Sequence, residues 1–200
     1  KDFFVIQGDF ENTNRKEKII CTFKKGFKKN IKRNEKNYNK ISDHIGLIPL
    51  VIISPADQDL IIEGSATRRK FIDSVIGQTD KIYLQNILNY NKLLSQRNAL
   101  LKYFAFNYKF DKENLDVYNY QLSELAKPVF EKRFSFLESF IPLFIESYIK
   151  ISGSNETVSI SYRSDLKEKT PLELFDENLE KDRVLKFTTT GIHKDDLEFK

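Results

Sequence analysis

The chain has 200 residues, a length that suits one domain or one lobe of a larger protein. Its hydrophobic content of 40%, with 17 Phe and 9 Tyr, is enough to form a buried core, and no apolar run approaches the ~18 residues that a membrane span needs. The first residues lack the layout of a secretory signal, and the single cysteine, Cys21, cannot form an internal disulfide. We therefore expect a cytoplasmic protein that does not associate with membranes.

The positive charge is concentrated near the start of the chain. Residues 15–40 contain eleven Lys or Arg and two Glu, a local balance of +9, whereas the whole chain carries +4. Such a block favours a polyanionic partner such as DNA, because each phosphate that a cation neutralises releases counterions. The alternative is that the lysines protect an exposed strand edge from aggregation. The candidate DNA contacts of this block are Lys24, Lys25, Lys28, Lys29, Lys32 and Arg33.

The first fifty residues have the pattern of short strands. The runs "FFVIQGDFE", "KIICTFKKG" and "KKNIKRN" favour β-structure and are separated by Gly26 and an Asn-rich tract, which predicts antiparallel hairpins. Cys21 should be a small residue buried in the second run. The next run, "IGLIPLVIIS", is apolar on both faces, so we expect residues 50–53 to form a strand buried between layers.

A helical pattern begins near Ser65. Apolar residues between positions 71 and 76 form a stripe with helical spacing, Ser65 or Thr67 is a possible N-cap, and Gly77 is a possible end. The stretch "SPADQDLIIEGSATRRKFIDSVIGQ" therefore joins the predicted buried strand to a helix. Two helices follow, at about 81–106 with a leucine seam and at about 115–149 with an aromatic apolar side.

Pro128 and Pro142 predict breaks or kinks in the last of these helices. Three consecutive helices with short connections should pack as an antiparallel bundle. Strand patterns return after residue 153, in "ETVSISYRSD" and in "VLKFTTTGIHKDDLEFK", the second with a turn at Gly191. Between them lies a predicted short helix with Thr170 as N-cap and Pro171 at its first position. The order sheet, helical insertion, sheet indicates an α+β fold.

Two pairs of polar residues stand out in the helical part. Arg68 and Arg69 open a helix, where the helix dipole disfavours cations. One of them could pair with Asp73 or Glu63, and the other could contact phosphate or a second copy of the chain. Arg97 and the adjacent Asn98 lie in line with the leucine seam, so we expect buried hydrogen bonds to the backbone that fix the register of two helices.

The turn "GIHKDDL" places His193 beside Asp195 and Asp196, a combination that can bind metal. There is no second His or Cys near it in the sequence, so we predict no metal site. His44 is expected to be a turn residue.

Three separated segments resemble RecF-type recombination proteins. "VIISPADQDLIIEGSATRRKFID" resembles the family's apolar strand, Ser-Pro-Glu-Asp, Gly, Arg-Arg and Phe-Leu-Asp; "YLQNILNYNKLLSQRNALLK" resembles its Gln-Arg-Asn-x-Leu-Leu-Lys region; and "TTTGIHKDDLEF" resembles its Thr-x-x-Gly-Pro-His-Arg-Asp-Asp-Leu. The matches occur in the right order between Leu50 and Phe199, whereas residues 1–49 match only as basic hairpins.

The resemblance implies part of an ABC-type ATPase head related to the SMC and Rad50 proteins. Residues 1–62 and 151–200 would form a β-rich head lobe of mostly antiparallel hairpins, and residues 63–150 an inserted antiparallel helical bundle. The family binds ATP and Mg²⁺, clamps double-stranded or gapped DNA as an ATP-dependent homodimer, and works with recombination mediator proteins in gap repair and recombinase loading. The family's phosphate-binding loop and its signature and Walker B segments do not occur in the sequence. With no methionine and a strand-like end, it is expected to be a piece of a longer protein that does not hydrolyse ATP alone.

The resemblance also implies roles for single residues. The Ser54 to Asp59 loop occupies the place of the Q-loop, so Asp57 or Gln58 is expected to sense the nucleotide through its Mg²⁺; Ala56 replaces the family's usual Glu. The alternative is that Asp57 only caps a turn.

Further DNA contacts are expected at Arg68, Arg69 and Lys194. Ile192 and Lys194 replace the family's Pro and Arg, so the Gly191 turn has no arginine fork for a bidentate bond to phosphate.

The function implied is that of a DNA-binding, ATP-dependent recombination mediator. Two alternatives remain at this point. One is a non-catalytic helical scaffold that docks a repair partner, and the other is the head of a different SMC-like ATPase or nuclease.

Overall fold

The computed structural model describes residues 2–12, 15–153 and 156–200. It divides into two compact units, Lys1–Val51 and Ile52–Lys200. The mixture of helices and antiparallel strands confirms the predicted α+β class. The division into a head lobe (1–62 and 151–200) and an inserted lobe (63–150) stays a prediction.

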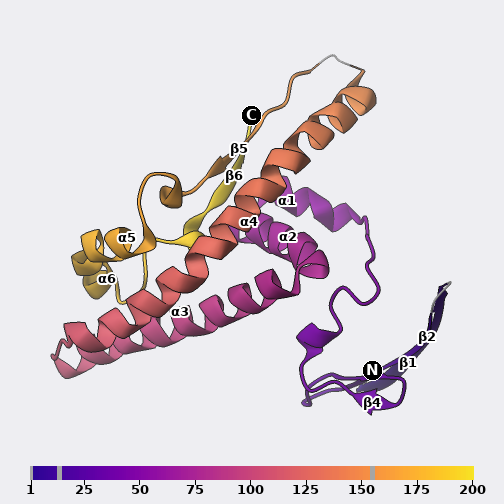
Figure 1. Ribbon diagram of the computed structural model, residues 1–200, viewed down its shortest axis with the longest axis horizontal. Coiled ribbons are helices and arrows are strands. Elements are labelled where there is room, and N and C mark those ends of the chain that lie inside the picture. Colours follow the sequence, from indigo (N-terminus) through magenta and orange to yellow (C-terminus); the bar gives the residue numbers. More distant parts are fainter. Residues whose placement is uncertain (1, 13–14, 154–155) are drawn as a thin grey trace. The chain divides into compact units, whose positions relative to one another are not determined.

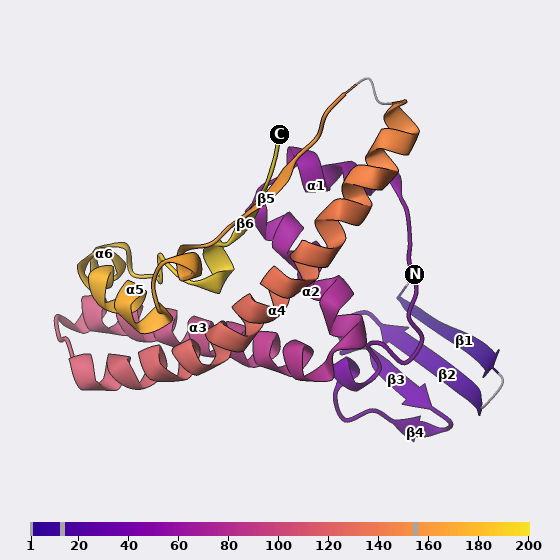
Figure 2. The same cartoon turned by 45° about the horizontal axis from the view of Figure 1, so that its top comes forward.

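The first unit is a four-stranded antiparallel sheet in the order β1-β2-β3-β4 (Figure 2). Its turns follow from local chemistry. Gly26, in the turn after β2, has a φ of 82°, a conformation that glycine adopts without strain. Asn34 and Glu35 both have positive φ values, of 46° and 71°, as a two-residue hairpin turn requires. The strands are β1 (Phe3–Asn12), β2 (Arg15–Lys24), β3 (Asn30–Arg33) and β4 (Lys36–Asn37).

The predicted strand at residues 50–53 is wrong. These residues have no regular secondary structure, and Val51 and Ile53 are each 89% exposed. Among the described residues no strand pairs with them, so their backbone lacks the partners that would form a buried layer. Cys21 does lie in β2 but is only half-buried.

The second unit begins with a short connection to the first long helix. A 3₁₀ turn (Pro55–Gln58) leads into α1 (Asp59–Ile62), and α2 runs from Ser65 to Thr79. The predicted caps of α2 are wrong: Gly64 is its N-cap with no side-chain cap bond, and the helix continues past Gly77. Gly77 is buried, and a Cβ there would lie 3.3 Å from Leu84 Cδ1, so its role is to allow close packing of α2 on α3.

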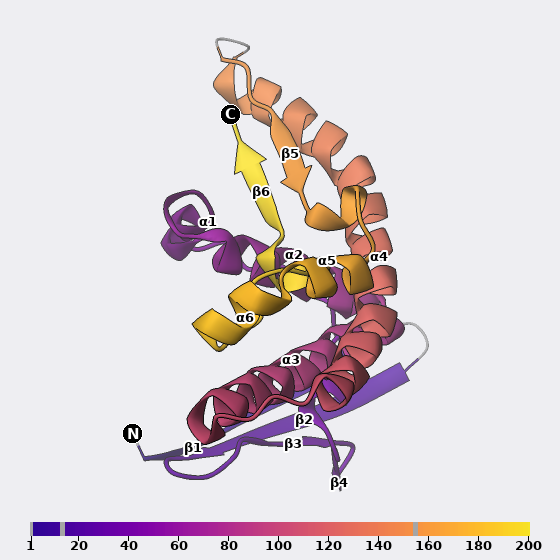
Figure 3. The same ribbon diagram turned by 90° about the vertical axis from the view of Figure 1, so that its left-hand side faces the viewer.

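Helices α3 (Lys81–Asn107) and α4 (Lys112–Ser152) form a long αα-hairpin (Figure 1). Each begins at an aspartate N-cap: Asp80 accepts from the Tyr83 amide and Asp111 from the Asn114 amide. Pro128 and Pro142 lie inside α4 without ending it, and the axis of α4 bends along its length (Figure 3). Because α3 ends at Asn107 and α4 begins at Lys112, the tip of the hairpin is a four-residue turn, residues 108–111.

The rest of the second unit returns along the helices. The predicted short helix in "KTPLELFDENLEKDRV" is confirmed at its start, where Thr170 is the N-cap and Pro171 the first residue, and Glu173 completes a capping box. It is not one helix, however, because the stretch divides at Asn178 into α5 and α6. The predicted strand at 184–190 is wrong: residues 184–185 end α6, and residues 187–190 form a loop held to the helices by side-chain hydrogen bonds. The elements are β5 (Ile160–Arg163), α5 (Pro171–Glu177), α6 (Leu179–Leu185) and β6 (Asp196–Phe199), with β5 and β6 antiparallel.

The main core lies between α2, α3, α4, α5 and the β5–β6 pair. A smaller cluster of Leu101, Phe104 and Leu115 lies near the tip of the αα-hairpin. Aromatic residues at positions 136, 140 and 144 stack successively along α4 and pack against the main core, as their spacing predicts. Within the part of the chain that the structure describes, no helix is long and apolar enough to cross a membrane.

Candidate nucleic-acid interface and the polar network of the helical unit

The basic residues of the sheet divide between its two faces. Lys24 and Lys32 lie on the same face, because Lys24 aligns with Thr22 and Ile20 along β2 and Ile20 is the cross-strand neighbour of Lys32. Arg33, one residue further along β3, lies on the opposite face, opposite Ile19. One face, called the lysine face here, thus carries Lys16, Lys18, Lys24 and Lys32, whereas Arg15, Arg33 and Lys36 lie on the other.

Arg33 has a partner within the sheet. Its Nε donates to Glu17 at 2.8 Å, its Nη2 also contacts Glu17, and Asn34 donates to the same carboxylate. The hydrogen bond from Arg33 lowers the pKa of Glu17. The contact of Arg33 with DNA stays a prediction. The structure also gives Arg33 a structural role, the pair with Glu17, that the sequence did not indicate.

The remaining predicted cations surround the turn after β2. Lys24 lies 4.7 Å over the ring of Phe27, and Lys25 lies 3.7 Å from Asp2 in an exposed pair. Lys28 and Lys29 follow directly and are exposed. The structure therefore brings four predicted lysines to one exposed turn.

The Ser54 to Asp59 loop shows the turn interaction that the sequence offered as an alternative. Asp57 accepts a hydrogen bond of 2.7 Å from the Ser54 amide, and Gln58 is exposed. Mg²⁺ in nucleotide sites takes one or two carboxylates, several waters and the substrate phosphates. Asp57 and Gln58 could therefore supply at most one carboxylate and one amide to such a site, and these two groups do not form the site alone.

Arg68 and Arg69 both attach the start of α2 to the start of β6. Arg68 forms a two-point ion pair with Asp196, at 2.8 and 3.1 Å, and also donates to the carbonyl of Glu63 at 2.7 Å. Arg69 donates to the carbonyl of Asp195. These internal partners explain two cations at a helix start, and contact of either arginine with DNA stays a prediction.

Arg133 is the centre of a buried network that the sequence did not reveal. Its side chain is 2% exposed and pairs with Asp73 of α2 and with Asp195, each at 2.9 Å. It also donates to the carbonyl of Ile192 at 2.8 Å. Burial opposes the charge on Arg133, but Asp73, Tyr83, Tyr162 and Asp195 together outweigh burial and raise the pKa of Arg133.

The same network includes two buried tyrosines. Tyr162 of β5 donates to Asp195 at 2.5 Å and Tyr83 of α3 donates to Asp73. Burial raises the pKa of Asp195, while Arg133 counteracts that shift. One signal was present in the sequence, since Arg133 occupies the apolar stripe of α4 four residues from both Val129 and Leu137.

Arg97 forms a second buried cluster. Its guanidinium donates to Asn119, Asp182 and Thr188, each at 2.7 Å. Its Nη2 has no hydrogen-bond partner among the described residues, and the guanidinium lies 5.1 Å over the ring of Phe175. The predicted burial of Arg97 is confirmed, but these three partners are side chains and not the backbone groups that were expected.

Asn98 contributes the backbone contact that the sequence predicted. It accepts from the amide and the hydroxyl of Thr188, each at 2.7 Å. Asp182 in turn accepts from the amide and hydroxyl of Thr189 at 2.8 and 2.7 Å. The bonds of Asn98 hold the 187–190 loop against α3, and those of Asp182 hold it against α6.

The Gly191 turn follows this loop. Gly191 has a φ of 115°, and a Cβ there would lie 2.7 Å from the hydroxyl of Tyr90. His193 Nε2 lies 3.1 Å from the carbonyl of Thr188, and its Nδ1 lies 3.0 Å from the Tyr90 hydroxyl. Because a carbonyl only accepts, Nε2 carries the proton and Nδ1 accepts from Tyr90.

Burial lowers the pKa of His193 to about 4, so the imidazole is neutral near pH 7. Lys194 is exposed and lies 5.3 Å over the ring of Phe187. Among the described residues, no group of three or more His, Cys, Asp and Glu side chains is placed to hold a metal ion.

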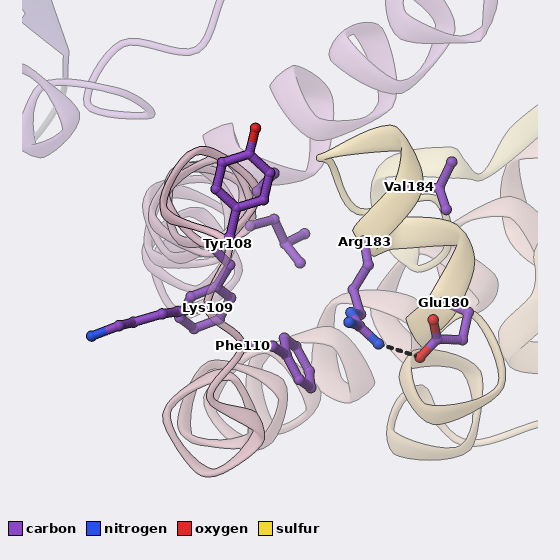
Figure 4. Close-up of a pocket in the computed structure, with 9 residues that line it drawn as sticks. Tyr108, Lys109, Phe110, Glu180, Arg183 and Val184 are labelled. Carbon is purple, nitrogen blue, oxygen red and sulfur yellow. Dashed lines mark hydrogen bonds and ion pairs between the residues drawn. The ribbon is translucent and has the colours of Figure 1, made fainter.

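A cavity of about 390 Å³ lies between the tip of the αα-hairpin and α6 (Figure 4). Arg183 lies 4.1 Å over the ring of Phe110 on one side of it and pairs with Glu180 at 2.6 Å. Tyr108, at the hairpin turn, is 97% exposed, and the nearby Phe106 is 83% exposed. The tip is therefore an aromatic surface that the sequence pattern did not indicate.

Comparisons with known proteins agree with the fold. No protein-family model matches the chain. It is 57% identical over 199 residues to the DNA replication and repair protein RecF of Flavobacterium johnsoniae, covering 100% of this chain and 55% of that protein. It is 44% identical over 198 residues to the RecF protein of Bacteroides thetaiotaomicron, covering 98% of this chain and 53% of that protein. The chain thus spans about half the length of the curated relatives it matches.

Two solved structures of the recombination mediator protein RecF in the RecFOR pathway are also similar. The TM-scores are 0.91 for the structure with ATP and 0.88 for the one with ATPrS, and in both cases 27% of residues are identical, with 100% of this chain and 56% of the other covered. The fold is thus that of part of a RecF ABC-type ATPase. The chain belongs to the RecF type of DNA replication and repair proteins.

Proposed function

We propose that the chain is the DNA-binding part of an ATP-dependent recombination mediator that acts in gap repair and recombinase loading. The observation that carries the proposal is the exposed turn of Lys24, Lys25, Lys28 and Lys29 beside the lysine face of the sheet. Cations held in this way neutralise phosphates without reading bases. The compartment proposed is the cytoplasm.

The test compares two charge-matched quadruple variants of the chain. In the first, Lys24, Lys25, Lys28 and Lys29 are changed to Ala. In the second, four exposed lysines of α3, α4 and the turn between them are changed to Ala; these are Lys92, Lys102, Lys109 and Lys127. Affinity for a labelled duplex is measured by fluorescence anisotropy over a series of salt concentrations.

We expect the wild-type affinity to fall steeply with salt and to depend little on base sequence. The first variant should lose on the order of three to four from the slope of log affinity against log salt, since each phosphate contact contributes about 0.9. The control should retain its slope. Equal effects in the two variants, or a salt-insensitive wild type, would show that the lysines serve solubility only.

The nucleotide role is proposed for Asp57 and Gln58. The two solved relatives are complexes of RecF with ATP and with ATPrS, and Asp57 fixes the loop that leads into α1. In the whole protein, ATP with Mg²⁺ would hold two copies as a dimer around DNA. Asp57→Ala in the whole protein should reduce ATP-dependent dimerisation in analytical ultracentrifugation, whereas Asp59→Ala, two residues on, should not; equal behaviour would contradict the role.

A second candidate function is a scaffold that docks a recombination mediator. The exposed aromatic tip of the αα-hairpin favours this function, because aromatic residues are enriched in protein–protein interfaces relative to the rest of the protein surface. Changing Phe106 and Tyr108 to Ser, both exposed, should leave DNA affinity unchanged and weaken binding of a purified mediator protein. If mediator binding is unchanged as well, the tip is not its docking surface.

A further inference from the structure

A polar cleft of about 480 Å³ lies in the second unit, and all of its lining residues belong to that unit. Three cationic side chains from three separate elements line it: Arg163 at the end of β5, Lys181 of α6 and Lys194 of the Gly191 turn. Ser65 and Thr189 also line the cleft, and the Thr189 hydroxyl donates to Asp182 at 2.7 Å. Cations and hydroxyls that converge on one hollow are the groups that recognise phosphate oxygens.

The two carboxylates that line the cleft do not cancel its charge. Asp195 pairs with Arg133 at 2.9 Å and accepts from Tyr162, so its charge is already compensated inside the protein. Asp165 accepts from the Thr190 hydroxyl at 3.3 Å. The lining therefore carries two lysines, and an arginine that is paired with Glu198, against the single uncompensated carboxylate of Asp165.

Arg163 lines the cleft and at the same time takes part in an exposed ion pair outside its lining. Its Nε lies 3.1 Å from Glu198, and its Nη2 lies 3.9 Å from Asp196, which itself is held by Arg68. Arg163 is 64% exposed, so the pair with Glu198 is solvated and a phosphate could compete for the guanidinium. Lys181 and Lys194 are exposed, and each can turn its ammonium group into the cleft without breaking a buried contact.

The cleft is held in shape by the buried networks below it. Thr189 is fixed by Asp182, and the Gly191 turn is fixed by Arg133 and by His193. Phe187 supplies an apolar floor under Lys194, at 5.3 Å. A rigid wall of this kind costs little ordering when an anion binds.

We propose that this cleft binds a phosphate group of a nucleic-acid backbone, as a second DNA contact separate from the lysine turn of the sheet. The choice of nucleic acid rests on the proposed function, whereas the choice of phosphate rests on the lining residues alone. Lys181 and Lys194 supply two phosphate contacts, and Arg163 a third when Glu198 releases it.

The experiment uses the whole chain and three variants. Lys181→Ala with Lys194→Ala removes two cleft cations, Lys92→Ala with Lys127→Ala removes the same charge from exposed helix positions, and Glu198→Gln releases Arg163. A labelled duplex, ATP and inorganic pyrophosphate are the probes, and thermal unfolding checks that each variant folds.

The cleft variant should bind duplex more weakly by on the order of tenfold, with a salt slope lower by about two, since removing each lysine that neutralises a phosphate lowers the slope by about one. The matched control should change much less, and Glu198→Gln should bind more tightly. Pyrophosphate should shift the amide resonances of Ser164 and Thr189 in the wild type and not in the cleft variant.

The outcomes separate the two proposals. If the lysine-turn variant keeps wild-type affinity for duplex while the cleft variant loses it, the proposed interface on the sheet is wrong and the phosphate site in the cleft is supported. If only ATP and pyrophosphate binding falls, the phosphate cleft serves a nucleotide and the nucleic-acid assignment is overturned. If the cleft variant matches its control with every probe, the cleft is not a phosphate site.

Discussion

The sheet of the first unit (Lys1–Val51) and the second unit (Ile52–Lys200), called the helical unit below, use cations in opposite ways. In the sheet, the lysines near the β2–β3 turn are exposed and contact at most an exposed acid or a ring, as Lys25 and Lys24 do. In the helical unit, Arg97 and Arg133 are buried and each contacts at least three partners. Exposed ion pairs contribute little to stability, whereas removing one member of a buried network leaves an uncompensated charge. The contrast separates cations available to a ligand from cations that hold the fold.

The largest expected effect is on the buried network. Arg133→Ala should destabilise the helical unit by about 3–5 kcal/mol, because Asp73 and Asp195 lose their counter-charge inside the protein. Lys150→Ala, which breaks an exposed i,i+4 pair with Glu146, should cost about 0.5 kcal/mol or less. Urea unfolding followed by far-ultraviolet circular dichroism reports on this unit, since it holds the α-helices. Similar costs for the two variants would contradict the contrast.

Gly191→Ala should cost roughly 3 kcal/mol. A φ of 115° is strained for alanine, at about 1–3 kcal/mol, and the new Cβ would meet the Tyr90 hydroxyl at 2.7 Å. Gly64→Ala is the control, because Gly64 has a φ of −73° and a Cβ added there would meet no atom within 4 Å. Its cost should be about 1 kcal/mol or less, as for an exposed N-cap. The same urea titration measures both, and equal costs would mean that the turn rearranges.

The next effect depends on pH. His193 has a pKa of about 4 in the folded chain and an ordinary value of 6.5, so the unfolded chain binds more protons between these values. Stability therefore falls as pH decreases through this window, by about 2 kcal/mol at pH 5 and about 3 kcal/mol at pH 4, at about 1.4 kcal/mol per pKa unit.

His193→Gln keeps a neutral polar group at every pH and should lose less stability over the same window. The measurement is the free energy of unfolding of both proteins from pH 7 to about pH 4. Parallel curves for the two proteins would show that His193 is not the group that titrates.

The smallest effect on stability is expected for the lysine turn. Changing Lys24, Lys25, Lys28 and Lys29 to Ala should alter the stability of the sheet by about 0.5 kcal/mol or less per position, because these side chains are exposed. Amide hydrogen exchange of β2 and β3 measures it. A large loss of protection would mean that the lysines support the sheet, and the contrast between the two units would weaken.

Local patterns in the sequence predicted most of the elements. The Thr170 N-cap and Pro171 adjoin the helix that they start, so the sequence alone predicted them. The aspartate caps at Asp80 and Asp111 are equally local, but they were not predicted. The predictions that were wrong concern segments whose state depends on distant partners. Residues 50–53 have a strand composition without a strand to pair with among the described residues, and residues 187–190 are held as a loop by Arg97 and Asn98.

The candidate site was predictable only in its exposed part. The lysines of the sheet form a contiguous block of sequence, so composition reveals them. Arg133 and Asp195 are 62 residues apart, and Arg68 and Asp196 are 128 residues apart. No periodicity encodes such pairs, because they form only when the β5–β6 pair packs on the helices. The cleft of Arg163, Lys181 and Lys194 has the same origin.

Helix α4 has 41 residues, which corresponds to a length of about 60 Å at 1.5 Å per residue. Arg133 fixes it near the middle, so the segment from Lys112 to Arg133 is a lever arm of about 32 Å. A tilt of about 10° around this fulcrum would move the tip of the αα-hairpin by about 5–6 Å, the rise of one helical turn. Any tilt of α4 about Arg133 would thus appear as a larger displacement at the aromatic tip.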